Sequence, residues 1–243
     1  MLPRLHVPTP LRVGDELVLP ANATRHVQVL RLQPGAAITL FDGGGGEWRA
    51  SVLRVGRSTV QAQVHEHIAR ESEGLIAVTV AMAMPANDRM DTLVEKATEL
   101  GVAAIVPLVS ERSVLRLAGE RADRRQAHWQ AIAIAACEQC GRNRVPSIRA
   151  VQSLATWLGD LAPAAPEEPR LLLGWREAMP WPQAVAHVGK ALTLLSGPEG
   201  GFTESEEDAA HLRGFVTTQL GPRVLRADTA PLACLAAIAL RAV

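Results

Sequence analysis

Short apolar segments separated by turn residues fill the first seventy positions of the chain. The predicted strands cover residues 17–19, 37–41, 48–55 and 59–64. Short strands at even spacing with turn signals between them predict a small β-barrel. The run Asp42-Gly43-Gly44-Gly45-Gly46 predicts a hairpin turn, because glycine supplies the positive φ such turns need. We prefer a turn to a phosphate loop, because no helical pattern follows it.

The pattern changes at residue 75, where a near-continuous apolar run begins (LIAVTVAMAM). A run of this kind is typical of a strand covered on both faces in a parallel sheet. Residues 89–100 follow with an apolar stripe at helical spacing, and Gly101 predicts the end of that helix. A second apolar strand is predicted at residues 103–109. The sequence therefore predicts a βαβ unit.

Alternation of apolar strands and amphipathic helices continues to the end of the chain. Further strands are predicted at residues 170–175, 191–196 and 216–220, and helices near residues 123–139, 178–188, 203–213 and 228–242. Thr203 and Glu206 form the pattern of a capping box, which predicts a helix start directly after a buried strand. The alternation favours a doubly wound α/β sheet, whose ligand sites lie beyond the carboxyl ends of the strands. We therefore expect two domains, residues 1–72 and 73–243.

Composition narrows the class of protein. The chain is 48% hydrophobic and 21% charged, which excludes a largely disordered protein. No apolar stretch approaches the roughly 20 residues of a membrane helix, and the start lacks an apolar signal core, so we expect a cytoplasmic protein without a membrane partner. Cys137 and Cys140 have the spacing of a metal or redox pair, but without a second pair we interpret them as packing residues. His65 and His67 lack an identifiable third ligand, and no metal is predicted.

Charge is unevenly distributed although the net charge is zero. Residues 1–70 contain eight arginines against five acidic residues, and residues 112–149 contain eight against three. Arginine makes bidentate phosphate contacts and stacks on bases, so both blocks favour an RNA partner. The alternative is a general preference for arginine over lysine. The candidates for RNA contact are Arg25, Arg31, Arg112, Arg142 and Arg144.

Three loops follow predicted strands at residues 173–175, 196–202 and 220–226. The middle loop reads GPEGGF after Ser196, and its glycines let the backbone approach a ligand closely while Pro198 stiffens the turn. Such a surface suits a flat adenosine moiety. The alternative is a tight strand-to-helix turn in which the glycines serve geometry alone.

Five ordered motifs resemble one known family. They are residues 90–102 (MDTLVEKATELGV), 110–113 (SERS), 138–142 (EQCGR) with Pro146, 197–202 (GPEGGF), and 220–226 (LGPRVLR) with Thr229-Ala230. In order and spacing they resemble the RsmE family over nearly the whole chain, and the segments HVQVLRLQPG and FDGGGG also fit. The resemblance implies a PUA-like β-barrel followed by a SPOUT methyltransferase domain with a trefoil knot. It also implies a homodimer that uses S-adenosylmethionine to methylate uridine N3 in 16S ribosomal RNA of the small subunit near the decoding site.

On this resemblance we assign candidate roles. The cofactor candidates are Leu173, Gly174, Gly197, Pro198, Glu199, Gly200, Gly201, Leu220, Gly221 and Leu225. Arg226 stabilises a developing uridine enolate or grips a phosphate, and Glu199 or Glu138 takes the N3 proton. Structural alternatives compete: Arg226 pairs with Asp228, Glu199 caps its own loop, or Glu138 bridges to an arginine.

The chain departs from the family pattern at two places. Ala86-Asn87 stands where Lys-Gly is usual, and Asp228 where glutamate is usual. Two other functions remain open. A noncatalytic RNA-binding function explains the basic blocks but does not explain the three strand-end loops. A nicotinamide-dependent dehydrogenase fits the sheet but lacks G-x-G-x-x-G after its first α/β strand.

Overall fold

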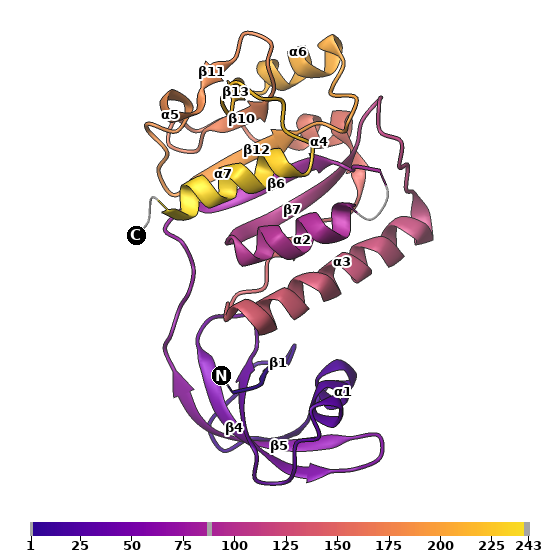
Figure 1. Ribbon diagram of the computed structural model, residues 1–243, viewed down its shortest axis with the longest axis vertical. Coiled ribbons are helices and arrows are strands. Elements are labelled where there is room, and N and C mark those ends of the chain that lie inside the picture. The colour runs from indigo at the N-terminus through magenta and orange to yellow at the C-terminus, as the bar shows by residue number, and fades with distance from the viewer. Residues whose placement is uncertain (1, 87–88, 241–243) are drawn as a thin grey trace. The chain divides into compact units, whose positions relative to one another are not determined.

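The computed structural model describes residues 2–86 and 89–240 of the chain. These residues form two compact units. Unit 1 comprises residues 1–73 with 134–145, and unit 2 comprises residues 74–133 with 146–243 (Figure 1). The long helix α3 (Gly119–Cys140) contributes to both, so its carboxyl-terminal third belongs to unit 1.

Unit 1 is built on a five-stranded sheet with the order β1-β3-β4-β5-β2. The strands are β1 (Arg4–His6), β2 (Glu16–Val18), β3 (Ala37–Phe41), β4 (Glu47–Val55) and β5 (Val60–Ile68). β1 pairs with β3 in parallel and the other pairs are antiparallel. The turn between β3 and β4 has positive φ at Gly43, Gly45 and Gly46, which confirms the predicted glycine hairpin. β1 was not predicted.

Helix α1 (Ala21–Val29) occupies a segment that the sequence pattern left unassigned. It begins after Pro20 without a side-chain cap and has no acidic residue in its first turn, so the usual start signals are missing. Its apolar residue Val27 is fully buried together with Leu5, Ile38 and Leu40. Tertiary packing therefore stabilises this short helix more than its own sequence does.

Unit 1 contains a network of buried charged and polar side chains. The guanidinium of Arg4, 6% exposed, donates to the carboxylate of Glu47, to Asn143 Oδ1 at 2.6 Å and to the Arg142 carbonyl at 3.2 Å. Asn143 in turn donates to the Arg70 carbonyl at 2.6 Å. This network joins β1, β4 and the segment after α3, so residues 134–145 are bonded to the rest of unit 1.

Unit 2 contains an eight-stranded sheet in which every pairing among the described residues is parallel. The main order is β11-β13-β10-β12-β6-β7-β8, and β9 pairs with β7. The strands are β6 (Ala77–Ala83), β7 (Val102–Val109), β8 (Ser147–Ile148), β9 (Gln152–Ser153), β10 (Arg170–Leu173), β11 (Met179–Pro180), β12 (Ala191–Ser196) and β13 (Phe215–Gln219). The predicted α/β fold with a parallel sheet is confirmed.

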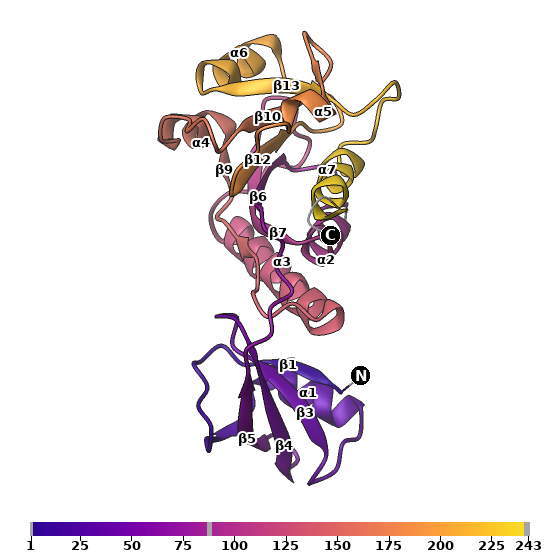
Figure 2. The same ribbon diagram turned by 90° about the vertical axis from the view of Figure 1, so that its left-hand side faces the viewer.

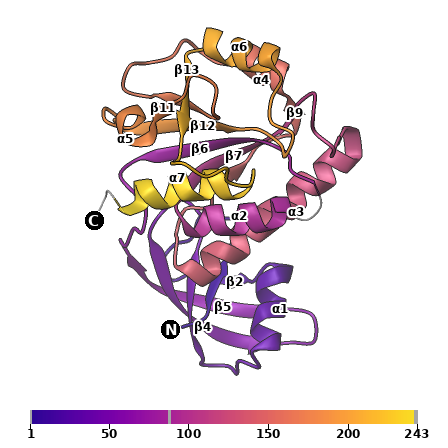
Figure 3. The ribbon, with the colours of Figure 1, turned by 45° about the horizontal axis from the view of Figure 1, so that its top comes forward.

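Helices cover both faces of this sheet (Figure 2). On one face α2 (Arg89–Glu99) and α7 (Thr229–Ala239) lie side by side, and α7 also contacts β12 (Figure 3). On the other face α4 (Leu154–Asp160) packs against α6 (Glu204–Leu212). Strands β6 and β7 with α2 between them form the predicted βαβ unit, and Gly101 at φ +88° follows α2 as expected.

Two helix predictions need correction. The helix predicted at residues 178–188 is the single turn α5 (Trp181–Ala184), preceded by β11. Pro180 and Pro182 lack N–H groups and fit only a first turn, so the helix does not begin at residue 178. Helix α4 was not predicted; it begins where the Ser153 hydroxyl accepts from the Thr156 amide at 3.0 Å. The end predicted for the last helix, residue 242, lies outside the described residues, as does Asn87.

In the described ranges, no helix combines the length and apolar character that a membrane crossing requires.

Candidate active site

Three neighbouring strands of unit 2 bring the three glycine-containing loops together. β13, β10 and β12 are adjacent and parallel, so their carboxyl ends share one edge of the sheet. A pocket of about 740 Å³ lies there. Among the sequence candidates, it is lined by Leu173, Gly174, Gly197, Pro198, Glu199, Gly201, Leu220, Leu225 and Arg226. Gly200 and Gly221 belong to the same loops but are not among its lining residues.

The loop after β12 needs glycine at two positions. A Cβ on Gly197 would lie 3.3 Å from the Gly201 backbone and from the Phe202 ring, so a larger residue would force the neighbouring loop atoms to shift. Gly201 has φ +66°, and its amide donates to the Pro198 carbonyl at 2.9 Å. One backbone conformation of this loop therefore both makes the tight turn and brings backbone groups to the pocket.

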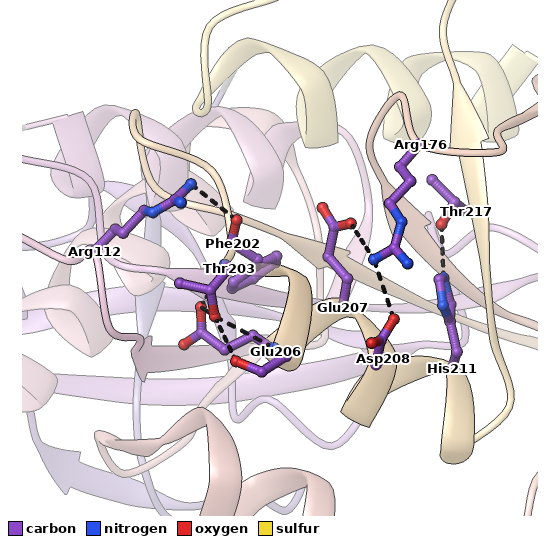
Figure 4. Close-up of polar contacts among 10 residues, drawn as sticks. Arg112, Arg176, Phe202, Thr203, Glu206, Glu207, Asp208, His211 and Thr217 are labelled. Atoms are coloured by element: carbon purple, nitrogen blue, oxygen red, sulfur yellow. Dashed lines mark hydrogen bonds and ion pairs between the residues drawn. The ribbon is translucent and has the colours of Figure 1, made fainter.

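Flanking contacts hold this loop in place. The Thr203 hydroxyl and the Glu206 carboxylate form the predicted capping box, which fixes the start of α6. Arg112 donates to the Gly200 carbonyl at 2.9 Å. It also donates to the Phe202 carbonyl at 3.1 Å (Figure 4). The structure thus places Arg112 against the loop, a contact that the sequence did not predict.

Glu199 joins the loop to another part of unit 2. Its carboxylate accepts from the Ala86 amide at 3.1 Å and from the Arg89 guanidinium at 3.1 Å. The idea that Glu199 caps its own loop is therefore wrong, since its partners follow β6. Ala86, one of the departures from the family pattern, contributes its backbone to this contact.

Arg226 and Asp228 occupy the loop that leads from β13 into α7. Arg226 is exposed and is one of the residues that line the pocket. Its side chain has no hydrogen bond or ion pair with any described residue, so the alternative pairing with Asp228 is not formed. Asp228 Oδ1 is buried without a hydrogen-bond partner in the described part of the chain. Thr229 and Ala230 already donate their amides to the Arg226 carbonyl, and residue 231 is proline, so the first turn offers Asp228 no donor.

Several lining residues were missed by sequence reasoning. Trp175 and Arg176 directly follow Gly174, and Arg223 lies inside the third loop, so their positions beside predicted residues were the available signal. Arg176 forms ion pairs with Glu207 at 3.7 Å and Asp208 at 3.1 Å on α6 (Figure 4). These contacts connect the loop after β10 to the helix that follows the GPEGGF loop.

Glu138, the second candidate for proton transfer, lies in unit 1. Its carboxylate accepts from the His6 amide at 3.0 Å and lies 3.5 Å from His26 Nδ1. Burial raises the pKa of this carboxyl group, while the contacts with His6 and His26 oppose that shift. Its partners are these two residues rather than an arginine, and it is not among the residues that line the pocket.

The predicted RNA-contacting arginines differ in availability. Arg25 and Arg31 are exposed, and Arg144 is exposed with its guanidinium 3.5 Å from Glu71. Arg142 is only 4% exposed and its guanidinium donates to the Glu73 carboxylate at 3.0 Å through Nε. The prediction that Arg142 contacts RNA phosphates is therefore wrong, because its charge is buried against an acidic side chain.

The first cysteine of the predicted pair, Cys137, is packed in the protein interior. Cys137 is buried and its thiol lies 3.6 Å from the Arg144 carbonyl. Burial raises the pKa of Cys137 to about 12, so its thiol is protonated at neutral pH. Residues 2–86 and 89–240 contain no cluster of three or more His, Cys, Asp or Glu side chains that could hold a metal ion.

The pocket has the properties of a small-molecule site. Its volume lies within the roughly 300–1,000 Å³ typical of ligand pockets. Glycine backbone, half-buried leucines and a few polar side chains line it, which suits a flat heterocycle with hydrogen-bonding edges. The residues present therefore fit a nucleoside-type cofactor such as S-adenosylmethionine.

Comparison with known proteins identifies the family. A sequence profile of RNA methyltransferase domains matches residues 72–239, and one of RNA methyltransferase PUA domains matches residues 19–64. Ribosomal RNA small subunit methyltransferase E of Synechocystis sp. is 34% identical over 96% of this chain and 76% of its own length. The Bacillus subtilis protein of the same name is 31% identical over 87% of this chain and 84% of its own length.

Solved structures agree with these matches. Ribosomal RNA small subunit methyltransferase E from Neisseria gonorrhoeae, bound to S-adenosylmethionine, is 38% identical with a TM-score of 0.91 and 98% and 97% coverage of this chain and that one. A Legionella pneumophila methyltransferase in complex with the same cofactor is 32% identical, with a TM-score of 0.92 and 99% and 98% coverage. Sequence, fold and pocket together show that the chain belongs to the ribosomal RNA small subunit methyltransferase E (RsmE) family of RNA methyltransferases.

Proposed function

We propose that this protein transfers a methyl group from S-adenosylmethionine to N3 of a specific uridine in 16S ribosomal RNA, near the decoding site of the small subunit. The coarser activity, S-adenosylmethionine-dependent methylation of small-subunit ribosomal RNA, follows from family membership. The observation that carries the proposal is the meeting of three strand-end loops in one pocket. A relative 38% identical over 98% of this chain is solved with that cofactor bound.

The loops at Gly174, Gly197 and Gly221 hold the cofactor in this proposal. Backbone groups of the GPEGGF loop bind its polar edges, and Leu173, Leu220 and Leu225 contact its adenine. Gly200 and Gly221 do not line the pocket; Gly221, at φ +98°, contributes through the turn that places its neighbours. When bound, S-adenosylmethionine supplies a methyl group already activated on a sulfonium.

The protein's side chains then have to position uracil and accept the proton that N3 loses. Arg226, a pocket cation without a described partner, stabilises the negative charge that develops on the uracil oxygens as N3 loses its proton. Glu199 is our first choice for the acceptor of that proton, because it lines the same pocket. Glu138 is the second choice. Alignment of N3 with the methyl group contributes most of the rate, since the methyl donor is already reactive.

The remaining architecture follows the family. We propose that residues 1–72 form a PUA-like barrel for RNA and that residues 73–243 form a SPOUT domain. In this proposal Arg25 and Arg31 of the barrel, together with Arg112 and Arg144 outside it, contact RNA phosphates. The packing of α7 against α2 and β12, distant in sequence, supports a carboxyl-terminal segment threaded into a trefoil knot. We also propose a homodimer and a cytoplasmic location, where ribosomal RNA is available.

Mapping of the methyl group tests this function. The purified protein is incubated with methyl-labelled S-adenosylmethionine and small subunits from a strain that lacks the activity, in parallel with free 16S ribosomal RNA. Mass spectrometry of nuclease fragments is expected to place one methyl group on N3 of one uridine. Omission of the protein controls for residual methylation. Methyl groups on ribose or on another base would contradict the N3 assignment, and no transfer to either RNA would contradict the activity.

A further inference from the structure

An exposed tryptophan forms part of the pocket wall. Trp175 follows β10, lines the pocket and is 48% exposed. All Trp and Phe residues of the chain lie in the described ranges, and Trp175 is the only one of them that is exposed. An indole at the edge of a pocket presents a flat apolar face, and aromatic rings stack on one another favourably, so Trp175 can take up a ring that enters the pocket.

The loop that carries Trp175 is held at three places. The Gly174 amide donates to the Thr218 carbonyl at 3.1 Å before the tryptophan, and Arg176 is paired with Asp208 after it (Figure 4). At the end of the loop, the Thr218 hydroxyl donates to the Met179 carbonyl at 2.9 Å. The indole itself makes no hydrogen bond or ring contact with the described residues. The backbone is fixed while the ring stays open to a ligand.

Two arginines also line this pocket. Arg223 and Arg226 line it from the loop after β13, and neither pairs with a described residue. Aromatic rings beside free guanidinium groups are the combination that proteins use for unpaired nucleotides, with the ring stacked on the base and the cation on the phosphate. The chemistry of this rim therefore matches a single nucleotide of an RNA chain.

We propose that the Trp175 indole is the platform on which the target uracil stacks when it enters the pocket; this inference rests on the proposed function. N3 lies on the pairing edge of uracil, so the base must leave its stacked and paired position before N3 can be methylated. Stacking on the indole replaces part of the lost contact. We assign the indole to uracil rather than to the cofactor's adenine, because Leu173, Leu220 and Leu225, less exposed than Trp175, supply the apolar contact that adenine needs.

Substitution at Trp175 tests the platform. Trp175→Ala is expected to weaken binding of a uridine-containing target RNA by about 5- to 150-fold and to raise KM correspondingly. Trp175→Phe, which keeps a stacking ring, should retain most of the affinity. The Kd for S-adenosylmethionine, measured by calorimetry, should stay unchanged in both variants. The slope of log affinity against log salt should also stay unchanged, because no phosphate contact is removed.

Trp181→Phe is the matched control, since Trp181 lines a different cavity and should leave RNA affinity at the wild-type value. Equal loss of cofactor and RNA affinity in Trp175→Ala would overturn the proposal in favour of adenine stacking. A change in oligomeric state by light scattering would overturn it in favour of a contact with a second chain. Wild-type RNA affinity and KM would also overturn it. Mass spectrometry of RNA methylated by the wild-type protein identifies the methylated atom. A failure of the proposed function is therefore distinguished from a failure of the stacking platform.

Discussion

Replacement of Arg226 by alanine is expected to lower kcat for methyl transfer by about 10²–10³-fold, the usual effect of removing one group that stabilises developing charge. The physical reason is that Arg226 is a lining residue of the pocket whose guanidinium has no described partner, so in the proposed mechanism its charge is free to stabilise the uracil oxygens. The Kd for S-adenosylmethionine should change little. Single-turnover kinetics with small subunits, combined with calorimetry of the cofactor, measures both quantities.

Arg226→Lys is the companion variant, and it should recover part of the rate because it keeps the charge but loses the planar fork of donors. A second comparison is Arg223→Ala, which removes another unpaired cation from the same loop. We expect that change to raise KM for RNA with little effect on kcat. If Arg226→Ala instead abolished cofactor binding and left kcat intact, the assigned role of Arg226 would be wrong.

Replacement of Glu47 by glutamine is expected to destabilise unit 1 by about 3–5 kcal/mol. Glu47 is 8% exposed and pairs with Arg4, which is 6% exposed, so the change leaves a buried guanidinium without its countercharge. Hydrogen exchange of the β4 amides reports the stability of unit 1 without requiring that the whole chain unfold in one step.

The exposed pair of Arg49 and Glu66 in the same sheet supplies the control. Its side chains are 63% and 56% exposed, and Glu66→Gln should cost less than about 1 kcal/mol because solvent screens the pair. Similar small losses for Glu47→Gln and Glu66→Gln would contradict the importance that we give to the buried network around Arg4.

Local sequence patterns predicted the parts of the fold whose signals are contiguous. The apolar run from residue 75 predicts β6, the stripe at 89–100 predicts α2, and Thr203 with Glu206 predicts the start of α6. The same patterns placed the three loops after predicted strands of a parallel sheet, whose ligand sites lie beyond the carboxyl ends of the strands. Most of the pocket was therefore accessible from the sequence.

Side-chain contacts between residues that are distant in the sequence could not be predicted from local patterns. The arginine block suggested that Arg142 faces RNA, but its burial depends on Glu73, which lies 69 positions earlier in the chain. The partners of Glu199 are set by the return of the chain after β6, which no local pattern describes. The open ring of Trp175 was missed for the same reason, since exposure is a property of packing rather than of spacing.

Titration of the purified protein with S-adenosylmethionine in a calorimeter tests whether the three loops form one cofactor pocket. We expect binding at one site per chain, displaced by S-adenosylhomocysteine and lost in Gly197→Val, because its branched side chain would press on Gly201 and Phe202 and displace the loop. Absence of heat and of displacement for the folded wild-type protein, or unchanged binding by Gly197→Val, would contradict it.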